Sequence, residues 1–478
     1  MYRLSTAPQW KPSLASARGP ASGCAPAAGG SGRPAALHGA LTRPRAFAKG
    51  TWVVGFGLAA ALPLAALLIA SPPPGRGFVL ELGSALGIVA LTVLALQLAL
   101  PARLGLVARP LGADVAVRLH RHLADVLVAA IAAHVALVVV DDPSHLALFD
   151  PLGAPWRAKA ALASCAALAA LIASSVLRRR LRLAYARWRG LHVTLGIGAI
   201  GLGVLHAIGV DHYLTSPAGL VLAALAGAAL LAIVELRLLR PRRLARRAYV
   251  LERVLPERGG ATTLALRAEG HRGRPFHPGQ FAWLKLADVP HALAEHPFSY
   301  SSSASWPERP TFTIKAYGGF TRRAPELRPG TRVLLDGPHG SFRARPHADR
   351  VVLIVVGIGI TPALSLLRSA ADACDRRPFV LIYGSLDWEQ ATFREELERL
   401  EQRIDLRVVH VLTNPHPGWQ GEAGFISADL LRRRLPYDLR AADVLVCGPP
   451  PMLDAALDGL RRLGVAPENV HAEQFVTV

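Results

Sequence analysis

Six long apolar segments occupy the first half of the chain. They lie at about 51–70, 78–100, 118–140, 159–177, 190–210 and 217–236. An α-helix of roughly 20 apolar residues is long enough to cross a hydrocarbon core of about 30 Å. The pattern therefore predicts a bundle of six membrane-spanning helices.

Two of the six segments contain a pair of histidines with the same spacing. His120 and His134 lie in the third segment, and His192 and His206 lie in the fifth. The spacing amounts to roughly four helical turns, so both histidines of a pair share one helix face and lie about 21 Å apart. A histidine inside a bilayer needs a partner, and neutral imidazole is an axial ligand of haem iron. The repeated spacing favours two stacked b-type haems, whereas a single such histidine is more often a hydrogen-bonded packing residue.

The charges between the apolar segments predict the topology. The second, fourth and post-sixth connections are rich in arginine, whereas the third and fifth carry aspartate. By the positive-inside rule both termini are cytoplasmic, and the third and fifth helices run from the inside to the outside of a plasma (inner) membrane. We therefore expect His120 to face His192 at an inner haem and His134 to face His206 at an outer haem.

The face of the fifth segment between its two histidines is nearly bare. It reads Gly196, Ala199 and Gly203 between His192 and His206. A flat porphyrin needs such clearance, but small residues also serve close packing of membrane helices. Both interpretations stay open at this point.

Composition supports a multi-domain membrane protein. The chain has 478 residues, 51% of them hydrophobic, and a formal net charge of +20. The arginines form short blocks between apolar segments, which is typical of cytoplasmic loops and not of a nucleic-acid surface. The cysteines are far apart and include no CxxC pair, which argues against an iron–sulphur module. Residues 1–50 are basic and rich in Ala, Pro, Gly and Ser, and we expect a disordered cytoplasmic tail there.

The pattern changes after the six-helix region, which we place at residues 51–247. Short alternating strands with Gly/Pro turns over 248–346 predict a small antiparallel β-barrel. Over 347–478 apolar strands alternate with helices, including one expected at 388–402, which predicts a doubly wound parallel α/β sheet.

Two glycine-containing turns are candidates for nucleotide contacts. The turn GIGITP (357–362) follows an apolar strand, and its glycines Gly357 and Gly359 would allow a dinucleotide to approach the backbone. Thr361 suits the N-cap and Pro362 the first turn of the following helix. A second helix start contains Gly318, Gly319 and Thr321, with Lys315 just before it. Backbone amides at a helix start bind phosphate, although such turns are often purely structural.

Several motifs occur together in one order. They are HPFSYSSS (296–303), IKAYGGFT (314–321), GPHGSF (337–342), GIGITP (357–362), CGPPPM (447–452) and HAEQF (471–475). This order resembles ferredoxin–NADP reductase-like flavoproteins. Together with the two histidine pairs, it is similar to the NADPH oxidase/ferric reductase family of transmembrane reductases over roughly residues 50–478.

The resemblance implies FAD and NAD(P)H as cofactors and assigns site residues. Phe298 would contact the flavin ring, Ser299 would hydrogen-bond near its reactive edge, and His296 would lie on the phosphate side. Cys447 and Gly448 would lie near the nicotinamide, and Phe475 near the flavin face. The resemblance also extends cofactor binding to the remaining motif positions Pro297, Pro449 and Met452. Of all these, Ser299, Cys447 and Phe475 would act in catalysis.

One departure from the family pattern concerns the nucleotide. Many NADPH-using relatives carry an arginine after the serine that ends the second strand of this domain, where it binds the 2′-phosphate. Leu386 occupies that position here. The choice between NADH and NADPH is therefore open.

The expected function is electron transfer from cytosolic NAD(P)H through FAD and two haems to a small acceptor outside, either a ferric chelate or dioxygen. Two rivals remain, a quinone-linked haem subunit and a six-helix transporter or scaffold with a redox-sensing nucleotide domain. The side chains in the predicted outer loops could meet a metal chelate or simply face water. They are Asp141, Asp142, His145, Asp211 and His212.

Overall fold

The computed structural model describes most of the chain from Arg45 to Gln474. The described residues are 45–69, 75–100, 113–178, 180–183, 185–213, a few single positions between 219 and 231, 243–287, 295–435, 439 and 441–474. Residues 1–44 of the expected N-terminal tail, most of the sixth apolar segment and Phe475 lie outside these residues. The last six residues of the expected tail, 45–50, belong to a helix and not to a disordered segment.

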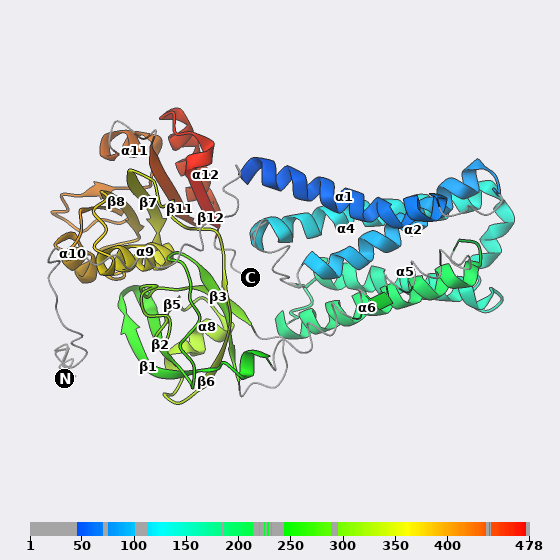
Figure 1. The fold of residues 1–478 in the computed structure, drawn as a ribbon, viewed down its shortest axis with the longest axis horizontal. Coiled ribbons are helices and arrows are strands. Elements are labelled where there is room, and N and C mark those ends of the chain that lie inside the picture. The colour runs from blue at the N-terminus through cyan, green and yellow to red at the C-terminus, as the bar shows by residue number, and fades with distance from the viewer. Residues whose placement is uncertain are drawn as a thin grey trace, which may run out of the picture. The chain divides into compact units, whose positions relative to one another are not determined.

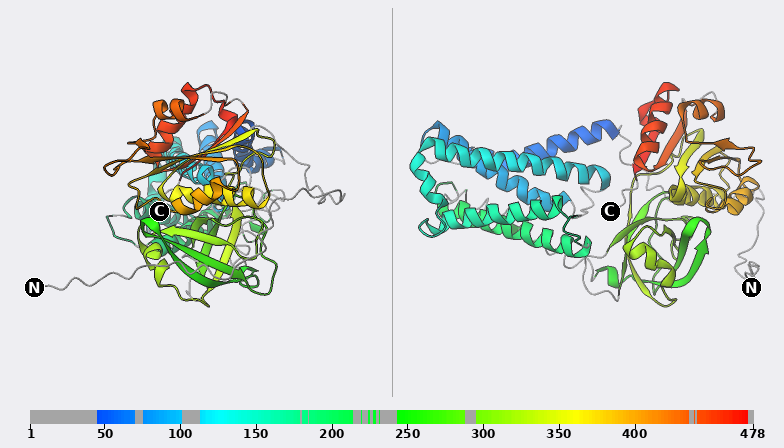
Figure 2. Two further views of the ribbon diagram at one scale, coloured as in Figure 1. Left: turned by 90° about the vertical axis from the view of Figure 1, so that its left-hand side faces the viewer. Right: turned by 180° about the vertical axis from the view of Figure 1, so that it is seen from behind.

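The apolar half of the chain folds into long helices that run alongside one another (Figure 1; Figure 2, right). They are α1 (Arg45–Ile69), α2 (Phe78–Ala99), α4 (Ala113–Asp141), α5 (Trp156–Val176) and α6 (Tyr185–Val210). Among the described residues, α2, α4, α5 and α6 are long and apolar enough to cross a membrane. In α1 the apolar run is shorter, Val54–Ala66. The prediction of apolar membrane helices is confirmed for these four, while the count of six stays a prediction.

The outward faces of these helices are apolar, as a bilayer requires. Val140 is 69% exposed and Val176 is 77% exposed, whereas Ala199 and Ile200 of α6 are fully or almost fully buried. Large side chains that face outward in this way would be costly in water but find an apolar solvent in lipid. Apolar side chains therefore lie both on the outside of the bundle and in its core, where Leu94 and Leu127 are buried.

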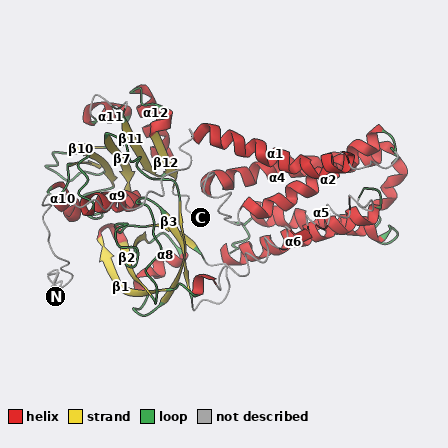
Figure 3. Cartoon of the chain, viewed as in Figure 1, coloured by secondary structure: helices red, strands yellow, loops and turns green. Residues whose placement is uncertain are grey.

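The first group of strands forms an antiparallel sheet in the order β4-β3-β6-β1-β2-β5 (Figure 3). Its members are β1 (Tyr249–Glu257), β2 (Ala261–Ala268), β3 (Phe281–Leu286), β4 (His296–Ser299), β5 (Thr311–Lys315) and β6 (Arg332–His339). A single bridge joins Tyr300, directly after β4, to Phe312 of β5, so the two edges of the order approach each other. Closure into a complete barrel stays a prediction. The short helix α8 (Gly319–Arg323) follows β5.

The second group forms the predicted parallel sheet, in the order β10-β9-β8-β7-β11-β12. Its strands are β7 (Arg350–Val356), β8 (Phe379–Ser385), β9 (Leu406–Leu412), β10 (Glu422–Ala423), β11 (Ala442–Gly448) and β12 (Val470–Gln474). One face packs against α9 (Ile360–Asp372) and α10 (Arg394–Glu401). The other packs against α11 (Ala428–Arg434) and α12 (Pro450–Arg462). Helices on both faces explain why the central strands are apolar throughout.

Two local predictions about helix starts are wrong. Thr361 is not an N-cap, because the glycine turn forms a 3₁₀ turn and α9 already begins at Ile360. The Thr361 hydroxyl donates instead to the Ile358 carbonyl at 3.0 Å. The helix expected at 388–402 begins only at Arg394, because Phe393 has a φ of 66°. A left-handed residue cannot continue a right-handed helix.

Candidate functional site

The four histidines of α4 and α6 form two facing pairs. The ring centroids of His120 and His192 are 6.1 Å apart, and those of His134 and His206 are 6.3 Å apart. These are the two pairs expected from the topology. In the same bundle, no group of three or more His, Cys, Asp or Glu side chains among the described residues is placed to hold a metal.

The separation of each pair fits a six-coordinate iron between the rings. With metal–nitrogen bonds of about 2.0–2.1 Å and about 1.15 Å from nitrogen to ring centre, two axial imidazoles have centroids about 6.4 Å apart. A site with only two protein ligands cannot satisfy a tetrahedral zinc ion, whereas haem supplies the other four nitrogens itself. The centroid distances of 6.1 Å and 6.3 Å are therefore compatible with an iron between the rings of each pair.

Hydrogen bonds to one ring nitrogen leave the other for a metal. His134 Nδ1 lies 2.7 Å from the Gly83 carbonyl, and His206 Nδ1 lies 3.0 Å from the Arg157 carbonyl. A carbonyl accepts only, so Nδ1 carries the proton, and in a neutral ring Nε2 is left unprotonated and available to a ligand. At the other pair, His192 Nδ1 lies 3.2 Å from the Ser175 hydroxyl.

Glycines of α2 make room for the His134 ring. A Cβ at Gly87 would lie 2.9 Å from His134 Nδ1 and 3.0 Å from its Cε1, closer than real contacts allow. The small residues of α6 serve helix packing in part, since a Cβ at Gly203 would meet Leu91 at 3.0 Å and Ala199 accepts a bond from Ser164 at 2.7 Å. These contacts support the packing interpretation of the face, and the clearance for a porphyrin stays a prediction.

The candidate flavin residues lie in β4. Ser299 is 4% exposed, and its hydroxyl has no hydrogen-bond partner among the described residues. Buried hydroxyls are nearly always satisfied, so this one fits a partner supplied by a bound flavin. The Phe298 ring is half-buried and lies 5.9 Å from that of Phe320 in α8. Pro297 is exposed beside it.

His296 stacks on an aromatic ring. Its ring lies 4.7 Å from that of Phe320, with an interplanar angle of 14°. Burial first, and then the charge of Arg189, lower the pKa of His296 below its usual value. The stacked imidazole extends the aromatic surface formed by Phe298 and Phe320, and its place on the phosphate side stays a prediction.

The turn before α8 is already partly satisfied. The Thr321 hydroxyl accepts the amides of Tyr317 and Gly318, each at 3.0 Å. These two amides are therefore engaged within the turn, and Gly319 begins the helix. Lys315 ends β5 and is half-buried, within reach of the same turn.

The candidate nucleotide site lies where the parallel sheet changes direction. The helix after β7 covers one face of the sheet and the helix after β11 covers the other. In such sheets ligands bind at the carboxyl ends of the two strands where this change occurs, here β7 and β11. Gly357 has a φ of 56°, which favours glycine, and a Cβ on Gly359 would lie 2.6 Å from the Cys447 carbonyl. The two glycine-containing turns thus meet at one edge, with Pro362 buried in the first turn of α9.

The β11 turn supplies a buried thiol. Cys447 is fully buried, and burial, followed by the charge of Glu473, raises the pKa of its thiol well above the usual value. The thiol therefore stays protonated and uncharged at physiological pH. Gly448 ends β11, Pro449 is the N-cap of α12, and Met452 packs against the core of that face.

Helix α9 ties the flavin segment to the nucleotide edge. Arg368 donates to the Ser301 carbonyl at 2.6 Å, and the Ser365 hydroxyl donates to the Ser302 carbonyl at 2.7 Å. Arg368 is itself held by two bonds of 2.7 Å to the Glu396 carboxylate. These contacts fix the segment that follows Ser299 relative to the glycine turn at the start of α9.

Sequence reasoning missed Arg368, Ser365 and Glu473 as members of this site. Glu473 pairs in register with Cys447, and its carboxylate accepts the Ser341 amide at 3.4 Å. Glu473 lies inside the HAEQF motif, and this position is the signal from which the sequence could have identified it as a site residue. The contacts of α9 join positions more than 60 residues apart and leave no periodic trace in the sequence.

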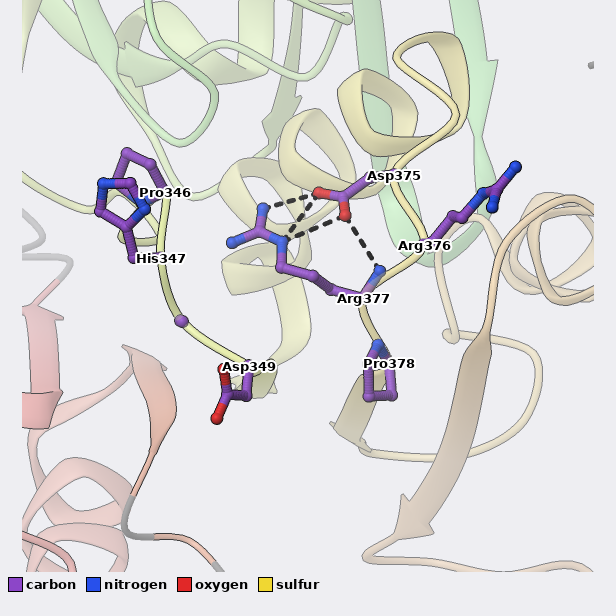
Figure 4. A pocket seen from close by; sticks show the side chains of 8 residues that line it. Pro346, His347, Asp349, Asp375, Arg376, Arg377 and Pro378 are labelled. Atoms are coloured by element: carbon purple, nitrogen blue, oxygen red, sulfur yellow. Dashed lines mark hydrogen bonds and ion pairs between the residues drawn. The ribbon is translucent and has the colours of Figure 1, made fainter. Parts of the chain in front are cut away.

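A surface depression lies away from this chemistry (Figure 4). It is lined by residues 346–349, which precede β7, and by 375–378, which precede β8, so it is at the amino ends of the strands. Its most prominent charge, Arg377, is paired with Asp375 at 2.6 Å. Nucleotides bind at the opposite edge of such sheets, and this depression is not the cofactor site.

Comparison with known families gives two matches within this chain. Residues 86–203 match the family described as ferric reductase like transmembrane component. Residues 353–458 match the oxidoreductase NAD-binding domain. Over the matched residues, the two findings agree with the resemblance to the NADPH oxidase/ferric reductase family that the motifs indicate. The first match contains α4 with both of its histidines and most of α6 with His192, and it ends before His206. The second match contains the turn GIGITP (357–362) and the motif CGPPPM (447–452).

Individual relatives share parts of this ferric reductase-like chain. NADH-cytochrome b5 reductase 1 of Aspergillus terreus is 32% identical over 161 residues, covering 32% of this chain and 54% of that protein. The corresponding protein of Arabidopsis thaliana is 31% identical over 161 residues and is matched over 57% of its length. The chain thus spans about half the length of the curated relatives it matches. The cytochrome b5 reductase domain of Ulva prolifera nitrate reductase is 21% identical, with a TM-score of 0.43 over 48% of this chain and 97% of that one.

Proposed function

We propose that the chain is a transmembrane oxidoreductase that carries electrons from cytosolic NAD(P)H, through FAD and two b-type haems, to an acceptor outside a plasma (inner) membrane. When bound, FAD converts a hydride into single electrons and haem iron relays them across the bilayer. The observation that carries the proposal is the presence of two facing histidine pairs. Their ring centroids are 6.1 Å apart in one pair and 6.3 Å apart in the other.

The side chains of the bundle have defined tasks in this proposal. His120 and His192 would hold the inner haem, and His134 and His206 the outer one. The carbonyl of Gly83 fixes the proton of His134 on Nδ1, so that Nε2 is available without a change of tautomer. Ligands held in this way need no rearrangement when iron changes its oxidation state.

The soluble residues bind and orient. Ser299 would hydrogen-bond the flavin edge with its otherwise unpartnered hydroxyl, and Phe298 would cover the ring. Gly357 and Gly359 would let the dinucleotide lie close to the backbone, and the neutral Cys447 thiol would line the nicotinamide position without adding charge. Phe475 lies outside the described residues, so its contact with the flavin stays a prediction.

We expect NADH to be the preferred nucleotide. Leu386 follows β8 and is 47% exposed, and it offers no charge to a 2′-phosphate. The nearby guanidinium of Arg394 is engaged with Trp388 and with glutamates. The curated relatives are named as NADH reductases, in agreement with this expectation.

One experiment tests the proposal and compares acceptors. The full chain in membranes is given NADH or NADPH, and haem absorption, oxygen consumption and ferric-chelate reduction are recorded together. We expect a b-type haem spectrum that is reduced by NADH and reoxidised by an acceptor. A protein without b-type haem absorption contradicts the proposal and favours a flavoprotein or sensor joined to a membrane scaffold.

A further inference from the structure

A second group of metal-binding side chains lies at the end of the bundle that holds His134 and His206. Glu81 is in the first turn of α2, whereas His212 and Tyr213 directly follow α6. They are brought together although Glu81 and Tyr213 are 132 positions apart. We call Glu81, His212 and Tyr213 the outer triad.

The members of the outer triad point their polar atoms at one another. The Tyr213 hydroxyl donates to Glu81 Oε2, and His212 Nε2 lies 3.4 Å from Glu81 Oε1. His212 Nε2 is buried and makes no hydrogen bond within the described part of the chain. The His212 side chain is only 13% exposed and that of Glu81 24%. A buried imidazole nitrogen beside a carboxylate, without a bond of its own, has the surroundings of a ligand atom.

The chemistry and spacing of this group suit a trivalent iron ion. The Tyr213 phenol would release its proton to solvent when it binds the ion. The resulting phenolate, the Glu81 carboxylate and one imidazole form a hard, anionic set that favours Fe(III) over softer ions. Ligand atoms bound at about 2.1 Å to one metal lie about 3.0–3.4 Å from each other. The separation of His212 Nε2 from Glu81 Oε1 is within that interval.

A cation beside the outer triad suits the organic part of a ferric chelate. The Arg76 amide and Nε bond to Glu81 Oε1 at 3.1 and 3.4 Å, and its terminal nitrogen donates to Ser84 at 2.9 Å. The Arg76 side chain is 30% exposed. A half-exposed guanidinium binds carboxylates well, so a citrate-like chelator would meet a positive group next to the metal ligands.

The outer triad lies next to the outer histidine pair. Glu81 is two residues from Gly83 in α2, and the Gly83 carbonyl accepts the bond from His134 Nδ1 at 2.7 Å. A ferric ion held by Glu81 would therefore be within about one helical turn of the outer haem ligand.

We propose that the outer triad is the substrate site for ferric iron delivered as a carboxylate chelate. The proposal rests on the function proposed above, which supplies the electrons. Each NAD(P)H that loses a hydride provides two electrons, which convert two Fe(III) to two Fe(II) and leave NAD(P)⁺ and one proton. Fe(II) carries one charge less and is held more weakly by anionic oxygens, so the product leaves.

The test uses the full-length protein in lipid nanodiscs. Gallium(III) citrate serves as the probe, because Ga(III) matches the charge of Fe(III) and is not reduced. Its binding is measured by equilibrium dialysis for the wild type, Glu81→Gln, Tyr213→Phe and the control Asp141→Asn, which removes an exposed carboxylate at the end of α4. The KM for ferric citrate and the rate with ferricyanide, which accepts electrons without being ligated, are measured in parallel.

We expect the wild type and Asp141→Asn to bind one Ga(III) per chain. Both triad variants should bind it about tenfold more weakly, about 1.4 kcal/mol, with a matching rise in the KM for ferric citrate and an unchanged ferricyanide rate. The proposal is overturned if the triad variants bind Ga(III) like the wild type. It is also overturned if ferric citrate and ferricyanide rates fall equally, since the triad would then only join α2 to α6. Intact Ga(III) binding without any reductase activity would instead reject the proposed function.

Discussion

Arg368 offers the sharpest test of how the flavin segment is held against the nucleotide edge. Its guanidinium donates to the Ser301 carbonyl at 2.6 Å and makes two 2.7 Å bonds to Glu396, while its side chain is 25% exposed. A hydrogen bond from a charged donor contributes about 1.5–3 kcal/mol to stability. The partly exposed ion pair adds about 0.2–1 kcal/mol.

Replacing Arg368 by alanine should therefore cost about 2–4 kcal/mol in the free energy of unfolding. At about 2–4 °C per kcal/mol for a unit of 150–250 residues, the Tm should fall by on the order of 10 °C. Arg368→Lys keeps the charge but loses the two parallel bonds to Glu396, and we expect an intermediate value. The rate of flavin reduction by NADH should fall with both variants, because the backbone after Ser299 is no longer fixed relative to α9.

The assay is thermal release of flavin fluorescence from the full chain, with stopped-flow flavin reduction on the same samples. Arg403→Ala is the matched control, because Arg403 is 56% exposed and makes a single 3.5 Å pair with Asp372. Such a pair contributes at most about 1 kcal/mol. Equal Tm and equal flavin reduction for Arg368→Ala and Arg403→Ala would refute the reasoning.

Three further predictions follow from individual contacts. Gly87→Ala places a methyl group 2.9 Å from the His134 ring and should reduce the haem content, measured by the pyridine haemochrome method. Gly198→Ala is the control, because its methyl group would have nothing within 4 Å, and it should keep the haem content of the wild type. Leu386→Arg should raise the ratio of kcat/KM for NADPH to kcat/KM for NADH by about 10–100-fold. This is the effect of about 1.5–3 kcal/mol from one charge-assisted hydrogen bond to the 2′-phosphate. An unchanged ratio would show that the 2′-phosphate lies elsewhere. Burial opposes ionisation of Asp443, but bonds from His471 and Arg345 hold its pKa below the usual value. Its contribution to stability is therefore complete above about pH 4 and lost as the pH falls further, so the wild-type Tm should drop more steeply there than that of Asp443→Asn.

Much of the fold was accessible from periodicity. The spacing of His120 and His134 on one helix and of His192 and His206 on another was enough to expect facing pairs, because helical geometry and loop charges determine both face and direction. The parallel sheet followed from apolar strands that alternate with helices.

The rest depended on contacts that sequence patterns do not record. Phe393 adopts a left-handed conformation that shortens α10, although the local composition favours a helix. Thr361 lost its expected capping role because the glycine turn continues directly into α9. The outer triad joins Glu81 to residues after α6, and no periodicity links such distant positions. The stacking of His296 on Phe320 joins β4 to α8, a contact that only the fold reveals.

The central claim is that four histidines hold two haems, and haem stoichiometry tests it most directly. Purified full-length protein should contain two b-type haems per chain. His134→Ala and His120→Ala should each leave one haem per chain. His145→Ala is the control and should keep two haems, because His145 belongs to neither pair and its Nδ1 bonds the Val138 carbonyl at 2.9 Å. A wild type without b-type haem, or a His134→Ala variant that retains two, would contradict the account.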